Sequence, residues 1–273
     1  MTKSKIEPSY IITTGWWCEE TEDKNNRESY NGSDEIRKVG FFDKWYSSVK
    51  KYCSPQEIVL IDSASPVLPN LTNKADVKII SLSLNAGHSS NHVGNFCGVT
   101  RAHILGMSYA LCCDVEYWVY IEQDALIQGE NIIEEAIEKN RKNIILGNGW
   151  KTPQPTQQSM MIMHRSEIPK FIENYQKIKK KDSEISPEMK FAISSTIWAQ
   201  YLPEFIFLEG KNNSKLRGYW LRILNYAFNN LGGYGKLPFG YGRERPINFN
   251  DKHYYFQHGS IDELRKHESK ENH

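Results

Sequence analysis

Short apolar segments alternate with helical segments through roughly the first 150 residues, and no other feature limits the fold as strongly. Aliphatic and β-branched runs predict buried strands at 10–14, 57–61, 77–82, 117–121 and 143–146. Apolar residues at helical spacing predict helices at 40–52, 99–112 and 131–140. Because strands that alternate with helices pair in parallel through crossover connections, we expect an α/β fold. Its sheet should be mainly parallel, of the Rossmann type, and flanked by helices.

The second half of the sequence is less regular. Its patterns predict a strand at 160–164, helices at 166–180, 191–201 and 216–230, and a strand-like run at 254–258. The stretch from 231 to 258 is rich in aromatic residues and glycine, and the stretch from 260 to 273 is polar. We therefore expect a C-terminal half with less regular structure.

The charge balance argues against binding to nucleic acid through a broad basic surface. Lys and Arg number 34 and Asp and Glu number 33, so the formal net charge is +1. Counterion release from nucleic acid needs an excess of basic residues. The sequence also has no apolar run of about 18 residues and no apolar signal core near Met1. We expect a cytoplasmic protein without a transmembrane segment.

The five cysteines do not form a pattern typical of disulfides or of a metal site. Their number is odd and no Cys-x-x-Cys is present. Cys112 and Cys113 are adjacent in an apolar stretch, so we expect them to be buried free thiols.

Three of the predicted strands end in small or polar residues. These ends are Thr13-Thr14-Gly15, Asp62-Ser63 and Glu122-Gln123-Asp124. Ligands of open parallel sheets bind beyond the carboxyl ends of the strands. If these strands are neighbours, the three ends converge on one site.

The pair Glu122 and Asp124 is the strongest chemical signal in the sequence. Residues two apart in an extended chain lie on the same side, and two close carboxylates repel unless a cation lies between them. A hard divalent ion that also binds a diphosphate would offset this repulsion. The alternative is a simple acidic turn at the end of a strand.

With these segments in order, the chain resembles GT-A-fold glycosyltransferases over roughly residues 10–165. Glu122-Gln123-Asp124 is a variant of the family's Asp-x-Asp motif, which follows its central strand. Asp62 with the small residues after it, and Asn85-Ala86-Gly87 before the helix at 98–110, match further family features. The resemblance implies one GT-A-like domain over 1–273. A nucleotide-sugar-binding half would span 8–150, and 151–273 would complete the site and bind the acceptor.

The resemblance also implies roles for the residues at the three strand ends. Thr13, Thr14 and Gly15 would line the nucleotide pocket. Asp62 would accept a hydrogen bond from the base, and Ser63 would support it.

The acidic motif would hold the metal. Asp124 would bind Mn²⁺ or Mg²⁺ and so hold the diphosphate, and Glu122 would contact the ribose or, through water, the metal. Glu122 stands where the family has its first aspartate. Because glutamate is longer, the sequence does not decide whether the contact of Glu122 is direct or through water. His258 matches, by position and by the glycine after it, a late histidine that many family members use as a further metal ligand. Imidazole favours Mn²⁺ over Mg²⁺.

Three further features have a functional and a structural interpretation. Arg101 at the start of a predicted helix could pair with phosphate or with Asp124, or could be a surface arginine. His88 and His92 have a spacing that binds zinc on a helix, but the glycines and serines around them predict a loop that could face the sugar or acceptor. Trp16-Trp17 could stack on base or sugar, or pack in the core.

Transfer with inversion needs a carboxylate that deprotonates the acceptor hydroxyl. Glu188 is the candidate, because Ser186 as N-cap and Pro187 at the first helical position would fix it in a first turn. Favourable interaction with the helix dipole is the alternative explanation for an acidic residue there. The sequence does not distinguish inverting from retaining transfer.

Two segments could help to complete the site. The stretch 234–246, rich in glycine and aromatic residues with two arginines, could order over the diphosphate or remain a surface loop. The basic run Lys177–Lys181 is either solvated or in contact with an anionic membrane that holds a lipid-linked acceptor.

Together these features predict a metal-dependent transferase that moves sugar from a nucleotide-diphosphate sugar to a hydroxyl of a glycan or glycolipid acceptor, as in polysaccharide biosynthesis. A sugar-phosphate nucleotidyltransferase is the enzymatic alternative, although residues 13–17 make a poor phosphate loop. A binding protein of the same fold without catalysis is the other.

Overall fold

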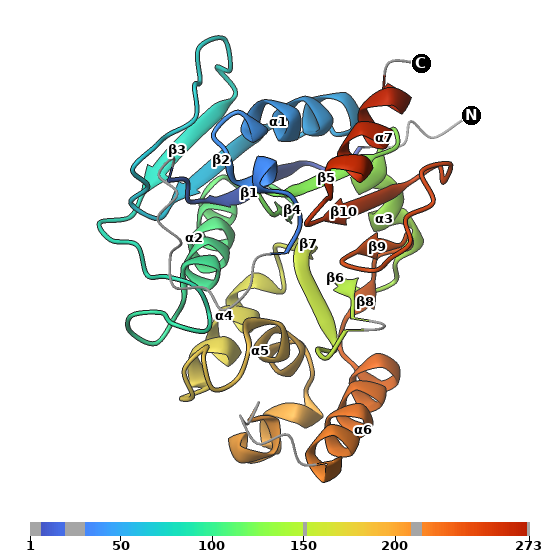
Figure 1. Cartoon of the computed structure of the whole chain (residues 1–273). Helices are drawn as coiled ribbons and strands as arrows, with labels where there is room; N and C mark the ends of the chain where they lie inside the picture. The colour runs from blue at the N-terminus through green and yellow to red at the C-terminus, as the bar shows by residue number, and fades with distance from the viewer. Residues whose placement is uncertain (1–6, 20–30, 150–151, 209–214, 272–273) are drawn as a thin grey trace, which may run out of the picture.

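A seven-stranded sheet forms the centre of the protein in the computed structural model, which describes residues 7–19, 31–149, 152–208 and 215–271 (Figure 1). The strand order is β3-β2-β1-β4-β7-β6-β8. Their bounds are β1 Tyr10–Trp16, β2 Glu57–Asp62, β3 Val77–Ser81, β4 Tyr117–Ile121, β6 Ile144–Asn148, β7 Thr156–His164 and β8 Gly235–Lys236. The expected mainly parallel α/β sheet is confirmed.

One strand of this sheet, β7, runs opposite to the other six. β1 pairs in parallel with both β2 and β4, so the three predicted strand ends do meet at one edge. β7 is antiparallel to β4 and to β6, whereas β6 and β8 are parallel. Hydrophobic pattern carries no information on strand direction, and the reversal at β7 was not predicted.

A smaller, three-stranded sheet adjoins the end of β4. It consists of β5 (Ala125–Gln128), β10 (Tyr254–Gln257) and β9 (Tyr241–Gly242), in the order β5-β10-β9. β5 and β10 are antiparallel, and Ala125 is opposite Gln257. The acidic segment 122–124 is therefore the link between the two sheets.

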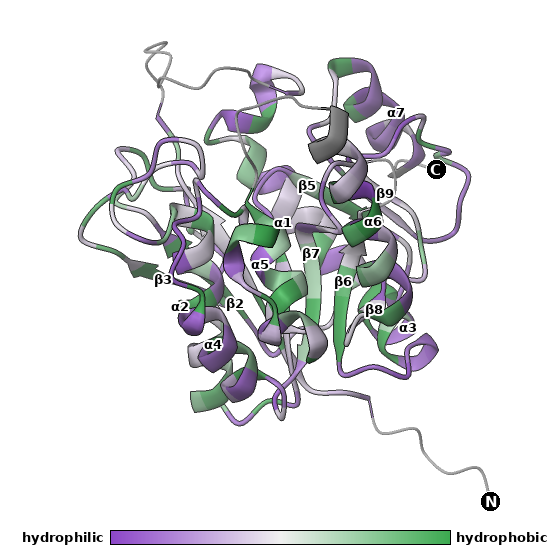
Figure 2. Cartoon of the chain, turned by 90° about the horizontal axis from the view of Figure 1, so that it is seen from below, coloured by the Kyte–Doolittle hydropathy of each residue, from purple (hydrophilic) through white to green (hydrophobic). Residues whose placement is uncertain are grey.

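Helices cover both faces of the large sheet (Figure 1). One core contains residues of α1 (Phe41–Tyr52), α3 (Ile132–Lys139), β10 and α7 (Ile261–Glu271). The other contains residues of α2 (Gly98–Cys112), α4 (Ile168–Lys177), α5 (Pro187–Ser194) and α6 (Lys215–Leu231). In Figure 2 the strands β6 and β7 are largely hydrophobic, while hydrophilic residues alternate along the outer helices.

The structure corrects one prediction of local structure. The helix expected over 191–201 is α5, which begins at Pro187 and ends at Ser194, followed by the short 3-10 helices η2 (Trp198–Tyr201) and η3 (Glu204–Phe207). Helix α7 within the polar stretch 260–273 and the 3-10 helix η1 (Asp34–Arg37) were not predicted.

The prediction that Cys112 and Cys113 are buried is wrong. Both are exposed, because Cys112 is the last residue of α2 and Cys113 is its C-cap. They are free thiols, as expected, and so are the buried Cys18, Cys53 and Cys97.

Candidate functional site

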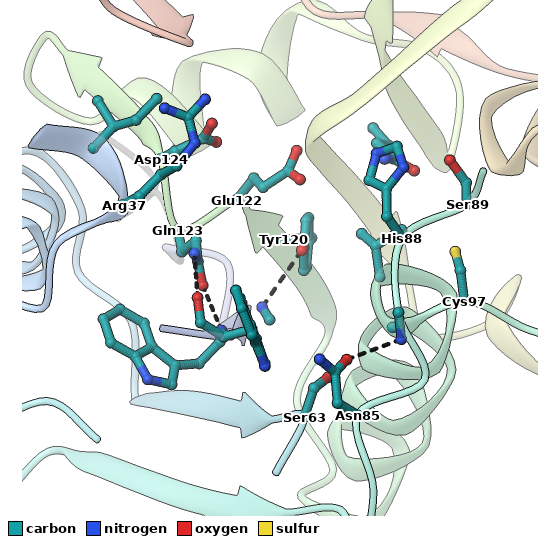
Figure 3. Close-up of a pocket in the computed structure, with 18 of the residues that line it drawn as sticks. Arg37, Ser63, Asn85, His88, Ser89, Cys97, Tyr120, Glu122, Gln123 and Asp124 are labelled. Carbon is teal, nitrogen blue, oxygen red and sulfur yellow. Dashed lines mark hydrogen bonds between the residues drawn. The ribbon is translucent and has the colours of Figure 1, made fainter. Parts of the chain in front are cut away.

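A pocket opens at the edge where β1 and β4 end, and the segment 85–98 closes its other side (Figure 3). Asp124, Glu122 and Arg37 lie on one side, and His88, Ser89 and Cys97 on the other. The first residues of α2, Gly98 and Val99, also line the pocket. The remaining lining residues are Gly15, Trp16, Trp17, Ile36, Ser63, Asn85, Gly87, Asn91, Tyr120, Gln123, Gln158 and His258.

Asp124 and His258 meet in this pocket although 134 positions (258 − 124) separate them in the sequence. Asp124 immediately precedes β5 and His258 immediately follows β10, and these two strands pair with each other. The distance from His258 Nε2 to Asp124 Oδ2 is 3.3 Å, and the side chains are 26% and 15% exposed. The structure thus brings together the two residues that the sequence named as metal ligands.

The state of these two side chains suits a divalent cation. Burial lowers the pKa of His258, as do Arg243, Arg37 and Arg245, while Asp124 opposes them. His258 is therefore neutral near pH 7, the form in which imidazole binds metals. Asp124 Oδ1 is buried and has no hydrogen-bond partner among the described residues. Among the described residues, no three or more His, Cys, Asp and Glu side chains are arranged so that they could hold a metal ion by themselves.

Hydrogen bonds fix the rest of the acidic segment. Glu122 Oε2 accepts a bond of 2.7 Å from Gln257 Nε2, again across the junction of the two sheets. Gln123 makes two bonds to the backbone of Trp17, one donated to its carbonyl oxygen and one accepted from its N–H. Gln123 therefore positions the chain just after β1, and Trp17 borders the pocket. Its neighbour Trp16 also borders the pocket, but its ring is buried in the core.

The opposite wall rests on a buried ion pair that sequence analysis did not identify. Asp182 Oδ1 lies 2.7 Å from Lys190 Nζ, and both side chains are fully buried. Asp182 Oδ2 accepts a hydrogen bond of 2.8 Å from the backbone N–H of Cys97, the residue before α2. Lys190 also donates to the carbonyl oxygen of Lys180 at 2.6 Å. These bonds attach α5 and the segment before it to the start of α2.

Two predicted nucleotide contacts lie outside the pocket lining. Thr13 and Thr14 are buried within β1. Thr13 Oγ1 accepts a hydrogen bond of 2.8 Å from Trp118 Nε1, and its bond with β4 stabilises the sheet. Of Thr13, Thr14 and Gly15, only Gly15 is among the residues that line the pocket, because β1 continues as far as Trp16.

Asp62 and Arg101 are occupied elsewhere as well. Asp62 is buried, and its Oδ1 accepts a bond of 2.9 Å from the backbone N–H of Ser65, so it holds the turn after β2. Ser63 does border the pocket. Arg101 donates to the carbonyl oxygens of Phe96 and Val93, at 3.1 Å each, and so holds the loop before α2 rather than Asp124.

Glu188 has the local structure predicted for it but lies outside the pocket lining. Ser186 is the N-cap of α5 and accepts a bond from the N–H of Met189, and Pro187 is the first helical residue. Glu188 Oε1 lies 3.3 Å from Arg243 Nη2. Arg245 of the segment 234–246 donates to the carbonyl oxygens of Gln257 and His258, so this segment reaches the backbone beside the site, although none of its residues lines the pocket.

His88 and His92 lie in a loop, as their neighbours predicted. His88 borders the pocket, and its Nδ1 lies 3.0 Å from Ser90 Oγ. His92 Nε2 accepts a bond from the N–H of Ser183. The two rings therefore serve different contacts.

Sequence analysis missed several lining residues. Arg37 is the last residue of η1, Tyr120 and Gln158 lie within β4 and β7, and Cys97 directly precedes α2. Tyr120 and Gln158 occupy strand positions whose alternation of side chains is the same as that of residues in the core. No signal in one sequence separates Tyr120 from the buried residues beside it.

Comparison with known proteins does not identify a family for this chain. No protein-family model matches the sequence, and no curated protein matches it. A solved structure similar to this chain is mannosyltransferase PcManGT from Pyrobaculum calidifontis in complex with GDP-Man and Mn²⁺. The match has 10% identity and a TM-score of 0.40, and covers 69% of this chain and 51% of the other, so this chain spans about half of that protein. A likeness this distant does not identify the ligands of this chain.

Within the described residues, no helix combines the length and hydrophobicity needed to cross a bilayer.

Proposed function

We propose that this protein is a metal-dependent glycosyltransferase that moves sugar from a nucleotide-diphosphate sugar to a hydroxyl of a glycan or glycolipid. The observation that carries the proposal is the pair Asp124 and His258, which face each other in a pocket at the carboxyl ends of β1 and β4. Two segments remote in the sequence meet there, and Oδ1 of Asp124 is buried with no hydrogen-bond partner in the part of the chain that the structure describes.

Asp124 and His258 would hold the cation through Oδ2 or Oδ1 and Nε2. A carboxylate combined with an imidazole suits Mn²⁺ better than Mg²⁺. When bound, the cation supplies positive charge that offsets the negative charge growing on the diphosphate leaving group. Arg37, which borders the same side of the pocket, adds positive charge near that group.

The nucleoside would lie toward the end of β1. Gly15, Ser63 and Trp17 line that part of the pocket, and a side chain larger than glycine at position 15 would approach Tyr120 and Ala102. Gln123 holds the backbone of Trp17, and Glu122 is oriented by Gln257. We propose that Glu122 contacts the ribose, or the metal through water, and that Trp17 contacts the base.

The sugar and acceptor would then face the segment 85–98 and α5. His88, Ser89 and Asn91 present polar groups on that side. Glu188 stays the proposed base for an inverting reaction. Its present contact is Arg243, so the role requires Arg243 to release the carboxylate when substrates bind.

Binding of the donor tests the proposal directly. Thermal shift and calorimetry with a panel of UDP- and GDP-sugars, with and without Mn²⁺, should give a stabilised protein with one class of donor, because a ligand of the folded state raises its apparent stability. Asp124→Asn and His258→Gln should lose the Mn²⁺-dependent part of that stabilisation. The control is Asp114→Asn, whose carboxylate is exposed and paired with Arg165.

The same experiments decide between this proposal and the alternatives. Near-normal Mn²⁺-dependent binding and turnover in Asp124→Asn would refute the metal role. Turnover of a sugar 1-phosphate with a nucleoside triphosphate would identify a nucleotidyltransferase, an activity for which β1, extended through Trp16, leaves no glycine-rich phosphate loop. Donor binding without transfer to any acceptor would identify a binding protein.

A further inference from the structure

Helix α6 has apolar residues on two opposite sides. Leu224 and Phe228 face the core and are 3% and 1% exposed. Tyr219, Ile223 and Tyr226 repeat at spacings of four and three on the other side, where the tyrosines are 67% and 70% exposed. A helix that only covers a core has a polar outer side, so the outer stripe of α6 needs another explanation.

The neighbouring 3-10 helices extend this surface. Ile197, Tyr201 and Phe205 of the η2–η3 region are exposed, Tyr201 by 84%. Trp198 Nε1 donates to the carbonyl oxygen of Leu231, and Trp220 Nε1 donates to that of Ile206, so η2 and η3 lie directly against α6. We refer to the exposed residues Ile197, Tyr201, Phe205, Tyr219, Ile223 and Tyr226 as the α6 patch. Clustered exposed apolar groups of this kind mark sites of interaction.

The charge around the α6 patch is basic. The sequence of α6 has three basic residues and no Asp or Glu, and Arg222 is exposed next to Ile223. Lys179 and Lys181 are exposed on the segment beside η3. Glu204 of η3 accepts hydrogen bonds from the backbone N–H groups of Lys179 and Lys180, and Glu184 pairs with Lys180, so basic residues outnumber these two carboxylates without replacing them.

We propose that the α6 patch binds the surface of an anionic lipid bilayer. Tyrosine and tryptophan favour the boundary between headgroups and acyl chains, where the ring is buried and the polar end stays in water. Basic residues beside them attract anionic headgroups, and each contributes about fivefold to the binding constant. A helix whose sequence is basic and has no Asp or Glu fits a layer of anionic lipid headgroups better than a second copy of this patch, which would bring two copies of α6 with like charge together. The proposal does not depend on the function of the pocket.

Vesicle sedimentation with the full chain tests this inference. The protein should pellet with vesicles of phosphatidylcholine and phosphatidylglycerol, and much less with phosphatidylcholine alone. Tyr219→Ser with Tyr226→Ser, and separately Arg222→Glu, should each weaken binding at least fivefold without changing the melting temperature. Matched controls are Val93→Ser with Ile261→Ser, which remove exposed apolar residues elsewhere, and Arg141→Glu, which reverses the charge of an exposed arginine that is not part of the α6 patch.

Three outcomes would overturn the proposal. The first is no binding to anionic vesicles at moderate salt. The second is equal loss in the patch variants and their controls, which would mean non-specific adsorption. The third is a dimer, detected by light scattering, that the double tyrosine variant dissociates while vesicle binding is absent, since a second copy would then cover the patch. Quenching of tryptophan emission by brominated lipid, lost in Trp220→Phe, would place α6 itself at the membrane.

Discussion

The buried pair Asp182 and Lys190 should be among the most sensitive positions of the molecule. Asp182→Asn removes the negative charge and leaves the Lys190 ammonium fully buried with only the carbonyl oxygen of Lys180 and weaker neighbours. Lys190→Met leaves the opposite charge, with the N–H of Cys97 as its main partner. The double variant removes both charges together.

The magnitude follows from the burial. Breaking a buried pair by removal of one partner costs about 3–5 kcal/mol, because the remaining charge is uncompensated. A chain of this size loses roughly 2 °C of melting temperature per kcal/mol, so each single variant should melt roughly 6–10 °C lower. The double variant should lose far less than the sum of the two, because an apolar replacement of a whole pair is often neutral.

Denaturant unfolding of the wild type, the two single variants and the double variant gives the coupling energy between Asp182 and Lys190 directly. The matched control is the pair Glu173 and Lys177, at 2.5 Å but with side chains 52% and 62% exposed, for which less than about 1 kcal/mol is expected. Additive losses in the Asp182 and Lys190 cycle, or losses as small as in the control, would refute the reasoning. Since Asp182 also bonds Cys97, the single variants should weaken donor binding at temperatures where they remain folded.

Three further predictions concern single positions. His103 is fully buried, with both ring nitrogens unpartnered among the described residues and its pKa lowered to about 3 by burial. Below the ordinary histidine pKa of about 6.5, His103 binds a proton in the unfolded chain but not in the native state. The free energy of unfolding should therefore fall by roughly 2 kcal/mol from pH 7 to pH 5. His103→Leu should remove that part of the pH dependence, measured by urea unfolding. Glu188→Gln should lower kcat at least about 100-fold if Glu188 is the base, whereas a change confined to stability would assign it only to the contact with Arg243. Gly32→Ala should weaken Mn²⁺ binding in calorimetry, because a Cβ would lie 2.7 Å from the backbone of His258; unchanged affinity would mean that the loop adjusts freely.

The sequence predicted the strands of the large sheet well, because buried strands are short apolar runs with polar ends. The sequence did not predict elements whose hydrophobic pattern is weak or joins that of a neighbouring segment. β5 has four residues and follows the acidic segment without a break, so it did not stand out as a separate strand. α7 is polar overall and is held by a few apolar residues such as Leu264.

The site was predictable in part for a similar reason. Residues at the end of a strand stand out when they are acidic, as Glu122 and Asp124 do, and both border the pocket. Thr13 and Asp62 were chosen by the same rule of position, yet their side chains bond to Trp118 and to the turn after β2. The direction of a side chain at a strand end depends on where the strand stops, and β1 continues two residues beyond the predicted end.

The small sheet has a larger role than its size suggests, because its register sets the distance between Asp124 and His258. Ala125 is opposite Gln257, so the residue before β5 and the residue after β10 are forced together. A slip of one residue would exchange the two faces of β10 and remove His258 from the pocket. His258 itself has φ of 57°, an uncommon conformation for a residue other than glycine. The residue before it, Gln257, donates a hydrogen bond to Glu122. A backbone conformation of this kind persists only where its surroundings enforce it. The pairing of β5 with β10 therefore orients the imidazole of His258 toward the carboxylate of Asp124.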